Sequence, residues 1–146
     1  MIALKLSLPI SIHCRKAWER LITILQEIGP LPAAGLIHAY SGSHELIPQL
    51  ERMGLFISFA GSVTNPRSTH VHTAAETVSD NHLLIETDSP DILPYTVPDR
   101  DTCEYNEPAY VAAVAMSVAS IRKTAAEKIA AVTFDNGMRL FKWVAA

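Results

Sequence analysis

Cysteine and charge are both scarce in this sequence, and each shortage excludes a class of protein. Two of the 146 residues are cysteines, Cys14 and Cys103, which form neither a framework of several disulfides nor a C-x-x-C pair. We therefore expect a reducing compartment, most simply the cytoplasm, with the nucleus as an alternative. Twelve Lys and Arg against fifteen Asp and Glu give a net charge of −3. A basic sleeve that holds nucleic acid by its phosphates is thus excluded as the main binding mode, and a polyanionic substrate would need a local positive charge such as a bound metal ion.

Long hydrophobic runs are also missing. None reaches the roughly 18 residues of a membrane-spanning helix, which argues against a membrane protein. Residues 1–9 are largely apolar, but they lack the basic head and the cleavage-like tail of a signal peptide. Hydrophobic residues still make up 49% of the 16.0 kDa chain, which is enough for one folded domain with a real core and argues against a disordered chain.

Short β-rich apolar runs alternate with amphipathic helical stretches along the chain. We expect strands at 8–12, 35–37, 55–59 and 82–87, and helices at 17–28, 46–53 and 68–78. Gly29 and Gly54 are the expected terminators of the first two helices. Four such strand–helix units predict a parallel α/β sheet with right-handed crossovers, either open or closed into a barrel.

Two further helices are expected after a long polar loop at 89–106. The first starts near Glu107 and Pro108, because proline suits a first helical turn. The second opens on Thr124-Ala-Ala-Glu127, a capping-box pattern, and runs to Phe141. We expect Phe141 in the core, like Trp18 of the first helix.

Three of the four expected strands lead into a side chain that can bind a metal ion: His13, His38 and Asp88. The carboxyl ends of parallel strands share one edge, and neighbouring strands lie close to 4.8 Å apart, so these groups can converge on one cation. Two imidazoles and a carboxylate suit zinc or manganese, and also iron or nickel. Glu86 shares the strand parity of Asp88 and lies one layer deeper, where a carboxylate can orient an imidazole. The alternative for each histidine is a hydrogen-bonded residue of the core.

The residues after His13 have two interpretations each. Cys14 points to the opposite face from its neighbour, which favours a small buried side chain over a Cys–His nucleophile. Arg15 and Lys16 follow the first strand end and could meet a phosphate, or could form an ordinary solvated turn.

Five short segments, together with the end of the last helix, resemble the TatD-related DNase family in order and spacing. They are Ser11-Ile-His-Cys-Arg-Lys-Ala17, His38-Ala-Tyr-Ser-Gly42, Ser58-Phe-Ala-Gly61, Glu86-Thr-Asp-Ser-Pro90, Asn106-Glu-Pro108 and, near the end, Asn136-Gly-Met-Arg-Leu-Phe141. The resemblance implies a metal-dependent hydrolase of the amidohydrolase superfamily on a (β/α)8 barrel. Such enzymes cleave phosphodiester bonds in DNA, often as 3′–5′ exonucleases.

The resemblance also implies roles for individual residues. His13 and His38 would be metal ligands on the fifth and sixth barrel strands, and Asp88 on the eighth would be a ligand and the general base. Arg15 and Ser89 would lie near the substrate. The implied cofactor is a divalent ion, Mg²⁺, Mn²⁺ or Zn²⁺, and a metal-bound hydroxide would attack the phosphorus.

The sequence departs from the family pattern at its beginning. It has no opening His-x-His strand and no bridging glutamate from a fourth strand, and its first ten residues resemble the end of the helix before the fifth strand. Residues 1–146 would then be a partial domain, strands five to eight of the barrel, and a full barrel needs about 250 residues. Such a half would expose two strand edges and inward-facing apolar side chains, and turnover by the chain alone would be low or absent.

Several partners and functions stay open at this level. A homodimer, or the missing amino-terminal half, could close the barrel. The chain could be a non-catalytic module that pairs with an intact relative. It could also be a hydrolase of the same superfamily that acts on a C–N bond, with the specificity in the loop at 89–106.

Overall fold

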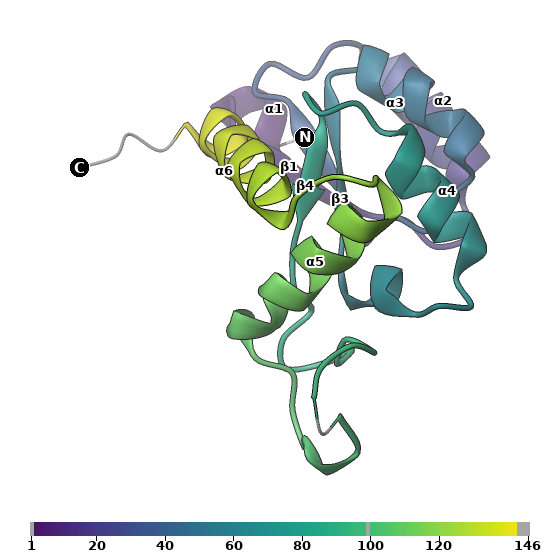
Figure 1. Ribbon diagram of the computed structural model, residues 1–146. Coiled ribbons are helices and arrows are strands. Elements are labelled where there is room, and N and C mark those ends of the chain that lie inside the picture. The colour runs from purple at the N-terminus through teal and green to yellow at the C-terminus, as the bar shows by residue number, and fades with distance from the viewer. Residues whose placement is uncertain (1, 99, 143–146) are drawn as a thin grey trace.

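Four parallel strands form the centre of the molecule (Figure 1). The structure is a computed structural model that describes residues 2–98 and 100–142. The strands β1 (Ile10–His13), β2 (Gly35–His38), β3 (Leu55–Phe59) and β4 (Leu83–Ile85) lie side by side in chain order, and every neighbouring pair is parallel. The predicted parallel α/β sheet is confirmed, although β4 is shorter than the run at 82–87.

Helices connect the strands and complete the chain. The helices are α1 (Ile2–Leu6), α2 (Trp18–Ile28), α3 (Ile47–Arg52), α4 (Thr69–Thr77), α5 (Val111–Ile121) and α6 (Ala126–Phe141), with short 3-10 turns η1 (His44–Leu46), η2 (Gly61–Thr64), η3 (Arg100–Thr102) and η4 (Pro108–Tyr110). The expected terminators are confirmed: Gly29 (φ +78°) and Gly54 (φ +77°) take the left-handed backbone that favours glycine. None of the described helices is long and apolar enough to cross a bilayer.

The capping box predicted for the last helix is wrong. Helix α6 begins at Ala126 with Ala125 at the N-cap and without a side-chain capping bond. Thr124 lies one residue too early, because its backbone N–H donates to the carbonyl of Ala119 at 3.0 Å and thereby closes the end of α5.

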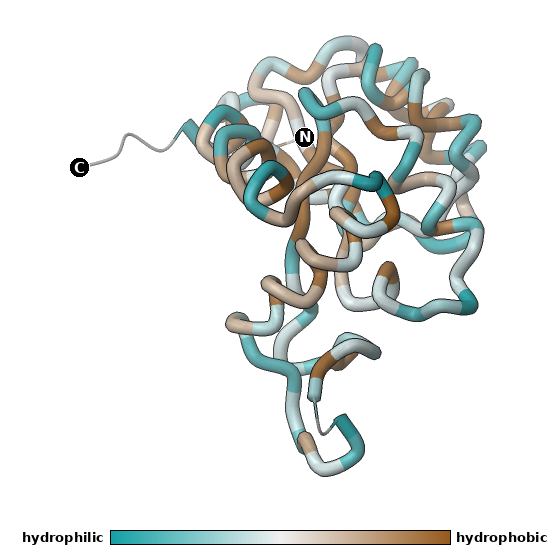
Figure 2. The backbone as a smooth tube through the Cα atoms, viewed as in Figure 1, coloured by the Kyte–Doolittle hydropathy of each residue, from teal (hydrophilic) through white to brown (hydrophobic). Residues whose placement is uncertain are grey.

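One face of the sheet carries the main core. Alternate strand residues such as Ile37, Ile57 and Leu83 are fully buried against α2, α3, α4 and α5, where Leu50 and Val118 are also fully buried. Figure 2 shows apolar residues along the strands and an alternation of apolar and polar residues in the helices around them. Trp18 packs against this core, as expected.

The opposite face of the sheet is covered more fully than the half-barrel hypothesis predicts. Leu36, Phe56 and Leu84 stand on the face that His38 and Glu86 share, and they are only 7%, 4% and 6% exposed. They form a second buried cluster with Leu140 of α6. The expectation of exposed inward-facing apolar side chains is therefore wrong for these three residues.

Helix α6 packs on the sheet through residues other than its aromatic side chains, Phe134 and Phe141. Its buried positions are Ile129, Thr133, Asn136 and Leu140, which recur every three or four residues and so form one stripe. Phe141 follows the last of them, falls beside the stripe and is 43% exposed. The prediction of Phe141 as a core residue is wrong.

Candidate metal centre

The carboxyl ends of the strands bring the predicted metal ligands to one edge. The register of the parallel strands pairs His13 with His38, and the ring centroids of these two residues lie 5.5 Å apart. The chain continues past β4 with Glu86, whose backbone N–H donates to the carbonyl of Phe59 at 3.0 Å. Asp88 follows three residues after the end of β4 and reaches the same edge.

The imidazole of His38 lies between two carboxylates. Its Nδ1 is 2.8 Å from Oε1 of Glu86, and its Nε2 is 3.1 Å from Oδ1 of Asp88. A carboxylate at Nδ1 favours the tautomer with the proton on that nitrogen, which leaves a lone pair on Nε2. This lone pair then faces an oxygen of Asp88, an arrangement that a cation bound between the two atoms would stabilise.

Glu86 also holds the backbone that follows His38. Its Oε1 accepts the backbone N–H of Ala39 at 2.6 Å, and Ala39 has a φ of +44°, which is uncommon for a residue other than glycine. One carboxylate oxygen thus fixes both the ring of His38 and the turn after β2.

The donor set is suited to a divalent cation. His38, Glu86 and Asp88 each offer one ligand atom, and these atoms lie within 4.8 Å of one another. The Oδ2 atom of Asp88 is buried and has no hydrogen-bond partner among the described residues. A buried carboxylate oxygen without a partner is costly, and a metal ion is one of the few groups that would satisfy it.

The structure places the remaining predicted residues around this group in different ways. His13 is exposed and lies beside His38, outside the group of three ligand atoms that approach within 4.8 Å. Arg15 is exposed just beyond the end of β1. The Oγ atom of Ser89 is buried, and no described residue pairs with it. Cys14 is 8% exposed, which confirms that it is a small buried side chain.

Close packing accounts for the residue types at Tyr40 and Gly42, in the segment that follows His38. Tyr40 is fully buried, its ring centroid lies 5.0 Å from that of Trp18, and its hydroxyl donates to the carbonyl of Ser43 at 2.6 Å. Burial raises the pKa of the Tyr40 hydroxyl above its usual range, so this group stays neutral. Gly42 is required here because a Cβ atom would lie 2.7 Å from the Tyr40 oxygen.

Sequence reasoning missed the role of Asn106, which it named only as part of the segment Asn106-Glu-Pro108. This residue is 4% exposed, and its Nδ2 donates to the carbonyls of Asp91 at 2.7 Å and Ile92 at 3.2 Å. Its backbone N–H donates to the carbonyl of Pro90 at 2.9 Å. Asn106 therefore clamps the turn that directly follows Asp88. The one signal in the sequence was its place in the segment Asn106-Glu-Pro108.

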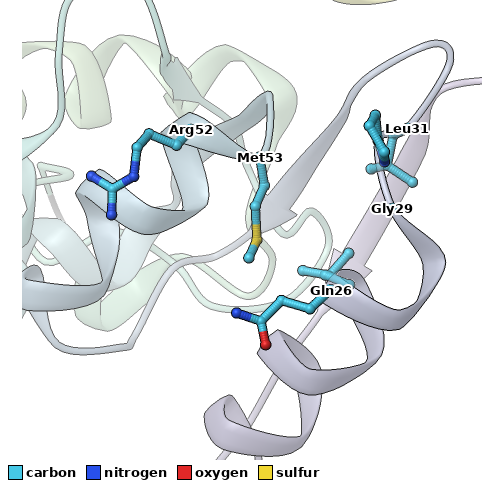
Figure 3. A pocket seen from close by; sticks show the side chains of 7 residues that line it. Gln26, Gly29, Leu31, Arg52 and Met53 are labelled. Carbon is cyan, nitrogen blue, oxygen red and sulfur yellow. The ribbon is translucent and has the colours of Figure 1, made fainter.

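One apolar cavity lies far along the sheet from these groups. It has a volume of about 270 Å³ and lies between the end of α2 and the end of α3, where Figure 3 shows Gln26 and Met53. Both helix ends precede the first residue of a strand, so the cavity lies at the amino end of the sheet. No histidine or carboxylate lines it, and it shares no residue with the His38 cluster. We therefore assign the chemistry to the carboxyl end.

Comparison with known proteins identifies the family. The model of the family described as TatD related DNase matches residues 1–142. The chain is 36% identical over 141 residues to the uncharacterized metal-dependent hydrolase YabD of Bacillus subtilis, covering 97% of this chain and 54% of that protein. It is 33% identical over 141 residues to the 3′-5′ ssDNA/RNA exonuclease TatD of Erwinia tasmaniensis, covering 96% of this chain and 54% of that protein.

Solved structures agree with the sequence relatives. The crystal structure of YJJV, a TatD homolog from Escherichia coli, matches with a TM-score of 0.86 and 26% identity over 98% of this chain and 53% of that one. A TatD family hydrolase from Entamoeba histolytica shares the fold with a TM-score of 0.79 at 21% identity, over 96% of this chain and 53% of that one. The chain spans about half the length of the relatives that it matches. It belongs to the TatD-related DNase family.

Proposed function

We propose that this chain carries strands five to eight of a (β/α)8 barrel and contributes a divalent-cation site to a hydrolase of phosphodiester bonds in nucleic acid. The observation that carries this proposal is His38 held between Glu86 and Asp88, with an unpaired buried oxygen on Asp88. Nucleic acid as the substrate is supported by the relative that is described as an ssDNA/RNA exonuclease.

Three side chains would hold the cation. We assign His38 Nε2 and the carboxylate of Asp88 as ligands because they already face each other at 3.1 Å, and His13 as a third ligand from the neighbouring strand. Glu86 would act on the other side of the His38 ring and fix its orientation. A divalent cation bound there supplies Lewis-acid chemistry toward a phosphate ester and lowers the pKa of water.

Asp88 would also serve as the general base. Its carboxylate has two oxygens, Oδ1 facing His38 and Oδ2 without a partner among the described residues, so that one can bind the cation while the other accepts a proton from the attacking water. Ser89 would donate its hydroxyl proton to a substrate oxygen, since its Oγ is buried and has no hydrogen-bond partner among the described residues. Arg15 would offer its cation to a phosphate from the end of β1. The proposed compartment remains the cytoplasm.

Closure of the barrel would complete the site. Strands β1 and β4 are the two edges of the sheet, and edge strands present backbone groups to a further strand. We propose that an amino-terminal half of the family type, or a second copy of this chain, pairs with these edges. The span of about half of each relative supports the first of these partners. Turnover by the chain alone is then expected to be low.

The test is hydrolysis and metal binding by the purified chain. We expect the chain to bind Mn²⁺ in isothermal titration calorimetry. It should hydrolyse bis(p-nitrophenyl) phosphate and a labelled single-stranded oligonucleotide more slowly than full-length YabD. His38→Ala should abolish Mn²⁺ binding and the hydrolysis of both substrates. His44→Ala, at an exposed position, should leave them unchanged. Failure to bind Mn²⁺, or hydrolysis that persists in His38→Ala, would overturn the proposal. Cleavage of a cyclic amide without cleavage of either phosphodiester would instead assign a C–N hydrolase.

A further inference from the structure

The segment between β4 and α5 carries an aromatic and a cationic side chain that the metal centre does not use. We propose that Tyr95 and Arg100 form a stacking subsite for one base and the adjoining phosphate of single-stranded nucleic acid. This inference rests on the proposed function and extends it, because it names the residues that would hold the substrate strand beyond the scissile bond.

The backbone at residues 90–95 of this segment is fixed in place although it has little regular structure. Asn106 clamps it through the carbonyls of Asp91 and Ile92. Gly61 packs against it so closely that a Cβ atom would lie 2.6 Å from the Ile92 carbonyl oxygen. The backbone N–H of Tyr95 donates to Oγ1 of Thr64 at 2.7 Å, and Thr64 is itself 5% exposed. Tyr95 is therefore presented from a pre-organised backbone, which lowers the entropic cost of binding.

The side chains on this fixed backbone face solvent. Tyr95 is 49% exposed although the guanidinium of Arg100 lies 4.5 Å from its ring centroid. Ile92, three residues earlier, is 55% exposed. Large apolar side chains on an ordered loop beside a candidate active site are typical of a binding surface. Both an aromatic ring and a guanidinium plane stack well on nucleobases, and the guanidinium can also reach a phosphate.

The position of the segment fits the path of a substrate strand. It follows Asp88 in the chain and projects beyond the carboxyl ends of the strands (Figure 1). Tyr95 stands seven positions after Asp88 in the chain, and this length of chain reaches at most about 24 Å. A strand whose terminal phosphodiester lies at the metal centre can thus place a nearby base on Tyr95.

The charges around the subsite decide its mode of recognition. Asp101 and Glu104 are exposed on the same segment as Arg100. These carboxylates oppose attraction of a polyanion by charge alone, so base stacking must supply most of the affinity. We therefore expect a shallow salt dependence, with a slope of log K against log[salt] near −0.7, which corresponds to one phosphate contact on a single strand.

Binding of two labelled strands in EDTA, measured by fluorescence anisotropy, tests this subsite. The strands are a ten-nucleotide oligothymidylate and an abasic strand of the same length and charge. Tyr95→Ala should weaken binding of the oligothymidylate about tenfold and should not change binding of the abasic strand. Tyr95→Phe should restore the affinity because the ring is retained. Arg100→Ala should lower the affinity for both strands, because both carry phosphates. Phe134→Ala, which removes a 65% exposed ring from α6, is the matched control without effect.

The outcomes separate this inference from the proposed function. Three results would overturn the stacking subsite. They are an unchanged affinity in Tyr95→Ala, an equal loss of affinity for both strands in Tyr95→Ala, and a steep salt dependence of binding by the wild type. Failure of the wild type to bind Mn²⁺ would overturn the metal centre alone, because the strand binding is measured in EDTA. A Tyr95-dependent preference for the strand with bases would then still stand.

Discussion

The two ends of the sheet treat their buried polar groups in opposite ways. At the amino end, Nδ2 of Asn136 donates to the carbonyls of Asp80 and Leu83, at 2.8 and 2.7 Å. Nη1 of Arg122 donates to two carbonyls at the end of α4. At the carboxyl end, the oxygens Asp88 Oδ2, Ser89 Oγ and Asn106 Oδ1 are buried without a partner among the described residues.

This difference separates stability from binding. Paired polar groups and the cluster around Leu140 make the amino end a place where a change costs folding free energy. Unpaired oxygens at the carboxyl end cost folding free energy already, and they are useful only when a ligand pairs with them. Variants at the two ends should therefore separate metal affinity from stability.

The largest expected effect is the loss of metal binding in Asp88→Asn. Replacing one carboxylate oxygen by an amide removes a charge and a ligand atom, so we expect the Mn²⁺ affinity in calorimetry to fall more than about 100-fold. The thermal midpoint should stay the same or rise, because the amide carries no charge for burial to penalise and its N–H can donate to His38 Nε2. Asp91→Asn is the matched control in the same turn, with an exposed side chain. An equal loss in both variants would contradict the assignment of Asp88.

At the amino end the opposite pattern is expected for Leu140→Ala. Leu140 is 2% exposed and covers Leu36, Phe56 and Leu84. The cavity should lower the free energy of unfolding by about 2 to 3 kcal/mol, measured by urea denaturation. Mn²⁺ affinity should not change. Phe134→Ala on the same helix should stay within about 0.5 kcal/mol of the wild type. A loss of metal affinity in Leu140→Ala would show that the two ends are coupled.

Local patterns predicted most of the fold. Strand β3 is predicted to the residue, because five residues of strand type stand between Gly54 and the Ala60-Gly61 turn. Pairing with the neighbouring strand, which a local pattern does not contain, shortened β4. The burial of Leu36, Phe56 and Leu84 could not be predicted either, because they are covered by Leu140 near the carboxyl end of α6, far away in the sequence.

The candidate site divides in the same way. The proximity of His38 and Asp88 could be predicted from the sequence, because the carboxyl ends of parallel strands share one edge of the sheet. The clamp by Asn106 could not be predicted, since its acceptors are backbone carbonyls 14 and 15 residues away whose position depends on the tertiary fold. Side-chain partners of strand ends follow from topology, whereas partners of a loop do not.

An intermediate effect is expected when Glu86 is changed to Gln. The amide keeps the shape but weakens the charge-assisted bonds to His38 Nδ1 and to the Ala39 backbone. We expect about a tenfold loss of Mn²⁺ affinity, as is usual for a group that orients a metal ligand. Glu76→Gln, at an exposed position of α4, should bind Mn²⁺ like the wild type. A complete loss of binding in Glu86→Gln would mean that Glu86 is itself a ligand.

The smallest expected effect is the acid sensitivity of the amino end, which arises from Asp80. A hydrogen bond from Lys128 and the charge of Arg122 hold the pKa of this carboxyl below its usual range, against the opposing effect of burial. A lowered pKa in the folded state means that the unfolded chain binds the proton more readily. The stabilisation is therefore present above about pH 4 and is lost as the pH falls through the carboxyl range. The side chain is 41% exposed, so solvent screening keeps the contribution below about 1 kcal/mol. Urea midpoints of the wild type and Asp80→Asn should differ at pH 7 and converge near pH 3. A gap that widens toward low pH would contradict a lowered pKa of Asp80 in the folded state.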